Sequence, residues 1–133
     1  MGILKLSLSH YGHYIHKETS SVEMCVLQYF LATDINCFIH YIPSYVEWAQ
    51  NNANDIGMSG ILTSLDKENG YILISHHKKQ SNKCHNQNPL EVKLKQQAFI
   101  NLLQDWQEKV CKHKPQEVTI IFNNNECSMD IKI

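Results

Sequence analysis

Residues 61–75 read ILTSLDKENGYILIS, and this stretch decides the fold class. Two apolar runs, 61–65 and 71–75, contain β-branched and aromatic residues that pack well in strands. The polar segment 66–70 separates them and ends in Asn69-Gly70, a dipeptide that readily adopts the positive φ angles of a tight hairpin turn. The stretch therefore predicts a β-hairpin and places antiparallel β structure at the centre of the fold.

Further strands are predicted on both sides of this hairpin. In residues 3–8, leucines alternate with Lys5 and Ser7, which is the period of two of a half-buried strand. Near the C-terminus, the apolar run 118–122, the turn 123–125 and the strand 127–133, in which Met129, Ile131 and Ile133 alternate with polar residues, predict a closing hairpin. An apolar run also predicts a buried strand that ends at Pro43. The strands predicted in this way, besides the hairpin, are 3–8, 11–16 after a break at Gly12, 36–42, 90–94, 118–122 and 127–133.

Three segments are predicted to form helices. The clearest has one apolar stripe, a lysine-rich last turn that favours the helix dipole, and Pro115 as its stop. Its stripe consists of Phe99, Leu102, Leu103, Trp106 and Val110.

Capping signals mark the other two predicted helices. Ser20 with Glu23 resembles a capping box in front of residues 22–31, which also have the composition of a strand; helix is the preferred interpretation. Ser44 with Glu47 marks a second, shorter helix.

These elements predict a single α+β domain over residues 1–133. We expect a mixed, mostly antiparallel sheet of about five to seven strands, with two or three helices packed on one face. The length of 133 residues is near the modal size of one domain, and the hydrophobic fraction of 43% is enough for an ordinary core.

The composition excludes several classes of function. All 12 basic residues are lysine, and the net charge is −1. Without arginine and without positive charge, neither binding to nucleic acid nor binding to an anionic membrane is expected. An AT-rich genome also accounts for the lysine bias. The chain has five cysteines, no CxxC pair, no signal peptide and no membrane-spanning run, which predicts a cytoplasmic protein with free thiols.

The eight histidines offer an alternative function. His10, His13 and His16 are three residues apart, and in a strand this spacing points neighbours to opposite faces. A second cluster combines His76 and His77 with Cys84 and His85, but the spacing matches no zinc motif. We therefore expect no metal and no cofactor. A small histidine-dependent enzyme of the RNase type remains open as an alternative, with His10, His13, His40, His76 and Lys78 as its conceivable groups.

No catalytic residue is assigned, because the chain lacks a GxSxG elbow and a phosphate-binding glycine loop. The segment from Glu47 to Glu68 instead contains four carboxylates and one lysine, and it begins near two aromatic residues. Acidic groups beside exposed aromatic anchors suit a protein interface, although an ordinary solvated face has the same composition. The candidate partner-binding residues are Tyr45, Glu47, Trp48, Asp55, Asp66 and Glu68.

Residues 90–133 resemble a segment of bacterial immunity proteins from contact-dependent growth inhibition and other polymorphic toxin systems. The similarity lies in LEVKL at 90–94, FINLLQDW at 99–106 and KPQEVTII at 114–121. It implies a cytoplasmic, non-catalytic protein that is monomeric when free and neutralises the C-terminal domain of a cognate toxin, often a nuclease, in a one-to-one complex. A structural or phage-type protein that self-associates is a third possibility.

Overall fold

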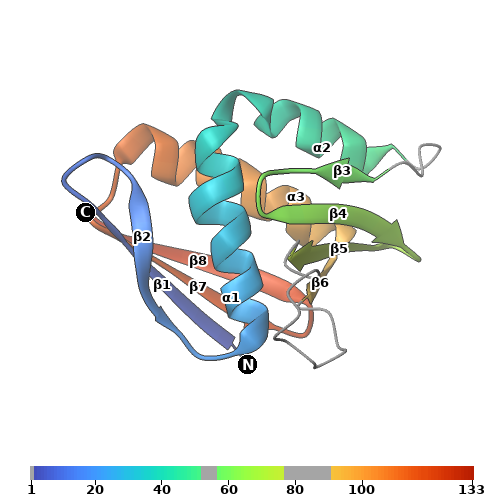
Figure 1. Ribbon diagram of the computed structural model, residues 1–133, viewed down its shortest axis with the longest axis horizontal. Helices are drawn as coiled ribbons and strands as arrows, with labels where there is room; N and C mark the ends of the chain where they lie inside the picture. Colours follow the sequence, from blue (N-terminus) through green and yellow to red (C-terminus); the bar gives the residue numbers. More distant parts are fainter. Residues whose placement is uncertain (1, 52–56, 77–90) are drawn as a thin grey trace.

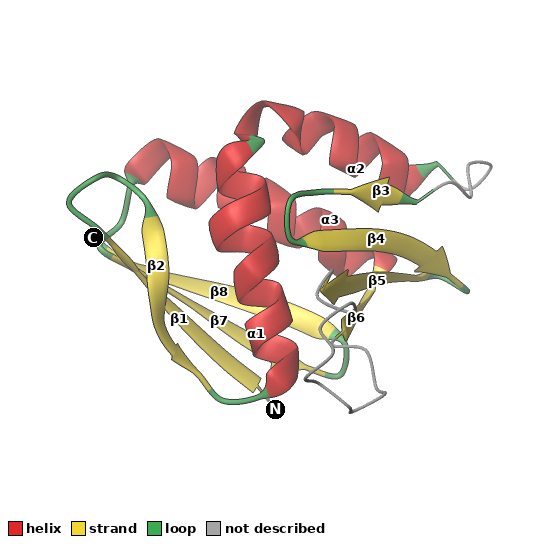
Figure 2. Ribbon diagram, viewed as in Figure 1, coloured by secondary structure: helices red, strands yellow, loops and turns green. Residues whose placement is uncertain are grey.

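The computed structural model describes residues 2–51, 57–76 and 91–133, which fold into two antiparallel sheets with helices between them (Figures 1 and 2). The predicted α+β class is confirmed. The strands divide between two four-stranded sheets instead of joining in one, and within the described ranges they number eight. In chain order the strands and α-helices are β1 (Gly2–Leu8), β2 (Tyr14–Thr19), α1 (Val22–Gln28), α2 (Ile42–Gln50), β3 (Met58–Ser59), β4 (Thr63–Glu68), β5 (Tyr71–His76), β6 (Glu91–Lys95), α3 (Gln96–Asp105), β7 (Glu117–Asn123) and β8 (Glu126–Lys132).

The first sheet has the strand order β2-β1-β7-β8 and joins the two ends of the chain. β1 pairs with β7 so that Leu4 lies opposite Ile120 and Leu6 lies opposite Val118. All four side chains are buried, and the residues between them point to the outer face. The alternation in the sequence therefore gives one face to the core and one to solvent.

The second sheet has the order β3-β4-β5-β6 and contains the predicted hairpin. Asn69 and Gly70 form its turn with φ angles of 51° and 87°. Because these two residues close the turn alone, β4 continues through Glu68. Asp66 and Glu68, expected in the turn, thus belong to the strand.

Helices α1 and α3 lie between the sheets, and α2 lies at the edge of the molecule (Figure 1). α1 contacts β1 and β2 on one side and β5 and β6 on the other, while α3 contacts β5, β6 and β8 and α2 packs on α3. Several aromatic rings meet within this largely aliphatic core. Phe30 and Phe99 have ring centroids 5.9 Å apart, and Tyr14 meets the buried Trp106 edge-on at 5.8 Å. None of the helices in the described ranges is long and apolar enough to cross a membrane.

The predicted strand at 36–42 is wrong. α1 continues into a π-helix, Tyr29–Ile35, and a 3-10 helix, Ile39–Tyr41, then leads directly into α2. Pro43 lies in the first turn of α2, where its missing N–H costs no hydrogen bond. A short apolar run fits a buried helix as well as a buried strand, so the pattern alone could not distinguish the two.

Helix α1 is confirmed, but it begins one residue later than the capping box predicted. Ser21 is the N-cap, and its hydroxyl accepts a hydrogen bond from the Met24 N–H at 3.3 Å. The hydroxyl of Ser20 accepts instead from the N–H of Ile3 at 2.7 Å and fastens the end of β2 to β1. Ser44 likewise is not a cap, because α2 begins at Ile42 without a side-chain cap.

Candidate functional site

The structure places the two candidate aromatic anchors inside the core. Tyr45 is 4% exposed and Trp48 is 7% exposed. The Tyr45 ring meets Phe30 at a centroid distance of 6.0 Å, and the Trp48 ring meets Phe99 at 6.4 Å. Since α2 turns this side inward, the expectation that Tyr45 and Trp48 are exposed is wrong, and their role is packing.

The candidate acidic residues lie on the surface, on two separate elements. Glu47 is exposed on α2, whereas Asp66 and Glu68 are exposed on β4. Glu68 forms an ion pair with Lys93 at 3.5 Å. Glu47 and Asp66 form no ion pair within residues 2–51, 57–76 and 91–133. Asp55 lies outside the described residues.

Asp66 and Glu68 belong to the outer face of the second sheet, which we call the β4–β6 face. Tyr71 lies opposite Glu68 on one side and opposite Lys95 on the other. The ring of Tyr71 is partly exposed, and the ammonium group of Lys93 is 5.0 Å from its centroid. This face therefore carries a central aromatic ring, with the carboxylates of Asp66 and Glu68 on β4 and with Glu91 and two lysines on β6. Its residues are Ser64, Asp66, Glu68, Tyr71, Leu73, Ser75, Glu91, Lys93 and Lys95.

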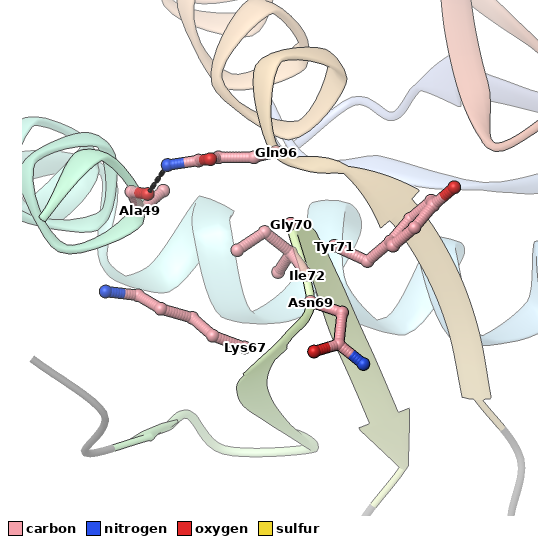
Figure 3. A pocket seen from close by; sticks show the side chains of 7 residues that line it. All are labelled: Ala49, Lys67, Asn69, Gly70, Tyr71, Ile72 and Gln96. Carbon is pink, nitrogen blue, oxygen red and sulfur yellow. Dashed lines mark hydrogen bonds between the residues drawn. The ribbon is translucent and has the colours of Figure 1, made fainter. Parts of the chain in front are cut away.

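A pocket of about 180 Å³ lies between α2, the β4–β5 hairpin and the start of α3 (Figure 3). Lys67 reaches from β4 to α2, where its ammonium group donates to the Asn51 carbonyl and lies 4.8 Å from the centroid of the Trp48 ring. The side-chain amide of Gln96 donates to the Ala49 carbonyl. The polar groups of Lys67 and Gln96 are thus used in contacts that connect α2 with β4 and α3. We therefore assign the pocket a structural role.

A wider groove of about 540 Å³ lies between α2 and the helix that begins with α3. Glu47 lines it, so one of the predicted contact residues borders a concave surface. The full lining consists of Pro43, Ser44, Val46, Glu47, Gln50, Gln104 and Gln107. The sequence assigned no role to the three glutamines, because their pattern is that of ordinary solvated residues.

The described histidines do not converge on one site. His10, His13 and His16 are exposed in and beside the β1–β2 turn, which lies on the other side of α1 from the second sheet (Figure 1). His76 stacks on Tyr29 with a centroid distance of 4.4 Å, and His40 is exposed next to α2. Among the described residues, no group of three or more His, Cys, Asp or Glu side chains could hold a metal ion. His77, Lys78, Cys84 and His85 lie outside the described residues.

The described cysteines are free thiols, and burial raises the pKa of two of them. The pKa of Cys127 rises from 9.0 to about 12, and that of Cys111 also rises, because both side chains are withdrawn from water. Both thiols therefore remain protonated at neutral pH. Cys37 is exposed, at the end of the first helical segment.

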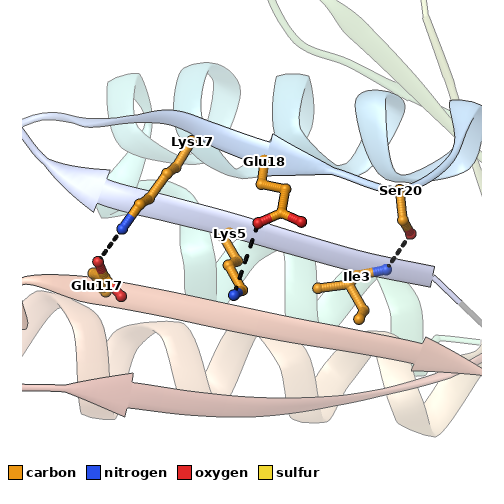
Figure 4. Close-up of polar contacts among 6 residues, drawn as sticks. All are labelled: Ile3, Lys5, Lys17, Glu18, Ser20 and Glu117. Carbon is orange, nitrogen blue, oxygen red and sulfur yellow. Dashed lines mark hydrogen bonds and ion pairs between the residues drawn. The ribbon is translucent and has the colours of Figure 1, made fainter.

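Ion pairs cover part of the outer face of the first sheet (Figure 4). Lys17 donates to Glu117, and Lys5 lies 3.8 Å from Glu18. The pKa of Glu117 is lowered chiefly by the hydrogen bond and charge of Lys17, with help from Lys132 and Lys5. Several charges on this face are thus balanced by their neighbours, whereas Asp130 on β8 has no ion pair among the described residues.

The sequence patterns did not single out one acidic residue that is important for the structure. Asp34 is completely buried in the π-helix, and its carboxylate accepts hydrogen bonds from the N–H groups of Ile61, Leu62 and Thr63 at 2.9–3.0 Å. Its burial could have been predicted from its spacing. Asp34 follows Phe30 by four residues and Leu31 by three, so in a helix it lies on the same buried side as they do. Its role is structural.

Several exposed carboxylates have no ion pair with a described residue, among them Glu23 and Asp130. Two of them are predicted contact residues: Glu47, which borders the groove, and Asp66, which lies on the β4–β6 face. No protein-family model, curated protein or solved structure matches this chain. Glu47 and Asp66 are therefore the residues from which a function is inferred.

Proposed function

We propose that this chain is an immunity-type binding protein that neutralises a cognate toxin domain by forming a one-to-one complex with it in the cytoplasm. The observation that carries the proposal is the β4–β6 face, where Asp66 and Glu68 lie exposed beside the ring of Tyr71. The resemblance of residues 90–133 to immunity proteins of polymorphic toxin systems supports the same function.

The β4–β6 face has the chemistry of a protein interface. A tyrosine provides a large, rigid contact surface with a polar tip, and such residues often contribute much of the binding free energy. Exposed carboxylates attract a basic partner, and a nuclease toxin has a basic surface because it binds a polyanion. Strand β4 carries Asp66 and Glu68, whereas β6 carries Glu91 together with two lysines. Because the charges differ between the two strands, a partner with the complementary arrangement would dock in one orientation.

The proposal is tested by co-expressing the chain with the toxin domain encoded beside it. We expect growth rescue and a one-to-one complex on size-exclusion chromatography. Replacing both acids, Asp66→Lys with Glu68→Lys, should weaken the complex about tenfold or more in calorimetry, which corresponds to at least about 1.4 kcal/mol. The control is Asp130→Lys, because Asp130 is also an exposed acid and lies on β8 of the other sheet.

Two results would contradict the proposal. One is the absence of both rescue and complex formation. The other is a complex whose affinity responds to Asp130→Lys but not to the Asp66 and Glu68 replacements, because binding would then use the first sheet.

A further inference from the structure

The groove beside α2 is formed by two facing helical stripes. Pro43, Val46, Glu47 and Gln50 follow one another at i, i+3, i+4 and i+7, so they lie on one side of α2. Gln104 and Gln107, three residues apart, form the opposite wall. The stripe on α2 is about 10 Å long at 1.5 Å per residue, which matches roughly three residues of an extended chain.

The groove carries one negative charge. Glu47 is its only ionisable lining residue and has no ion pair within the described parts of the chain. Glu108, next to Gln107, is already paired with Lys112 at 2.8 Å. A ligand in the groove therefore meets the carboxylate of Glu47 as its main electrostatic feature, which favours a cation and disfavours an anion.

The neutral lining suits a peptide main chain. Each glutamine side chain offers both a donor and an acceptor, so Gln50, Gln104 and Gln107 together can pair with peptide N–H and C=O groups. Val46 and Pro43 add apolar surface, against which the methylene stem of a long basic side chain can pack while its charged end reaches a carboxylate.

From this geometry we propose that the α2–α3 groove binds a short extended segment of a partner protein that carries an arginine or lysine directed at Glu47. Arginine is favoured over lysine, because its planar fork donates two parallel hydrogen bonds to one carboxylate. The inference rests on the proposed function only for the identity of the partner, since the groove is distinct from the β4–β6 face.

A peptide titration tests the groove without the toxin. The probe is acetyl-Ala-Arg-Ala-Arg-Ala-amide, added to the ¹⁵N-labelled chain and followed by NMR. We expect the side-chain amide signals of Gln50, Gln104 and Gln107 to shift together, and the same peptide with glutamate in place of arginine to leave them unchanged. Glu47→Lys should weaken peptide binding at least tenfold and Glu47→Gln should weaken it less, whereas Asp66→Lys should not alter it.

Two results of this titration would overturn the groove proposal. One is the absence of shifts at the three glutamines, and the other is an equal response to the arginine and glutamate peptides. A Glu47→Lys variant that keeps the wild-type backbone spectrum and still binds the arginine peptide would also overturn it. Glu47→Gln preserves the shape of the side chain and checks that an effect of Glu47→Lys reflects lost attraction.

The complex with the toxin domain separates this inference from the proposed function. If the toxin domain binds and Glu47→Lys weakens it tenfold while Asp130→Lys does not, both stand. If it binds but neither Glu47→Lys nor the peptide titration shows an effect, only the groove inference fails. If the toxin domain does not bind at all, the proposed function fails, and the peptide titration alone decides the groove.

Discussion

Asp34 and Thr63 are joined by two hydrogen bonds to a single oxygen atom: both the N–H and the hydroxyl of Thr63 donate to Oδ2 of Asp34. Oδ1 accepts from the N–H groups of Ile61 and Leu62. One buried carboxylate in the π-helix therefore satisfies three successive backbone donors, two just before β4 and one at its first residue. The central helix and the second sheet are fixed to each other at this point.

Asp34→Asn should destabilise the protein strongly. The amide that replaces one carboxylate oxygen presents N–H groups to donors, so at least one buried donor loses its acceptor at a cost of about 1–3 kcal/mol, and the remaining bonds lose their charge assistance. Urea unfolding should show a loss of about 3 kcal/mol in total. The control Asp130→Asn, at an exposed site on β8, should change the free energy of unfolding by less than about 0.5 kcal/mol. Equal effects of the two substitutions would contradict an anchoring role for Asp34.

Gly60→Ala tests the contact between residue 60 and the carboxylate of Asp34. A Cβ atom at residue 60 would stand 2.5 Å from Oδ2 of Asp34, which is held in place by its hydrogen bonds. We expect a loss of about 1–3 kcal/mol, typical of overpacking. In an Asp34→Ala background the cost should shrink, because the atom that clashes is gone.

Gly12→Ala is the control for this comparison of the wild-type and Asp34→Ala backgrounds. Gly12 has φ of +83°, and a Cβ atom added there would meet no other atom within 4 Å, so the cost of the substitution arises from the backbone alone. That cost should be the same with and without Asp34. A Gly60→Ala cost that is equally insensitive to Asp34 would show that the clash is not the cause.

Lys17→Met should raise the pKa of Glu117. The hydrogen bond and charge of Lys17 are the leading reasons that this pKa lies below its ordinary value of 4.5. Without them the carboxyl should titrate closer to that value in a ¹³C NMR titration. Lys112→Met is the control: it should raise the pKa of its own partner, Glu108, and leave Glu117 unchanged. An unchanged Glu117 titration in Lys17→Met would exclude the ion pair in solution.

The strands and the hairpin turns could be predicted because their signals are local. The alternation of apolar and polar residues over 3–8 and 127–133 predicts strands, and the dipeptide Asn69-Gly70 predicts a turn. Neither prediction requires knowledge of distant residues. The division into two sheets depends instead on which strands pair across long stretches of chain. The pairing of β1 with β7 joins residues more than 100 positions apart, and no local pattern specifies it.

For a similar reason, exposure was predicted correctly for only some of the candidate residues, and their contact with a partner stays a prediction. Charge alone indicated that Glu47, Asp66 and Glu68 would be exposed, since unpaired carboxylates are rarely buried. Tyr45 and Trp48 suit a core and an interface equally well, and only the packing of α2 against Phe30 and Phe99 decides between them. The glutamine-lined groove needed the tertiary structure, because its walls come from helices about 60 residues apart.

Alkaline pH should destabilise the protein through Tyr14 and Cys127. Burial raises the pKa of Tyr14 from 10.0 to about 12, and the pKa of Cys127 rises from 9.0 to about 12. The folded chain therefore keeps both protons at pH values where the unfolded chain releases them. Their contribution to stability is complete below pH 9 and is lost as pH rises toward 12.

Tyr14→Phe separates the phenol from the other groups in this pH range. At neutral pH the variant should lose about 1 kcal/mol, because the phenol donates a 2.7 Å hydrogen bond to the Pro115 carbonyl. Above pH 10 its urea midpoint should fall less steeply than that of the wild type, since phenylalanine has no proton to lose. Cys127→Ala should flatten the fall from pH 9 upward. If both variants lose stability as steeply as the wild type, ionisation of Tyr14 and Cys127 is not what unfolds the protein in alkali.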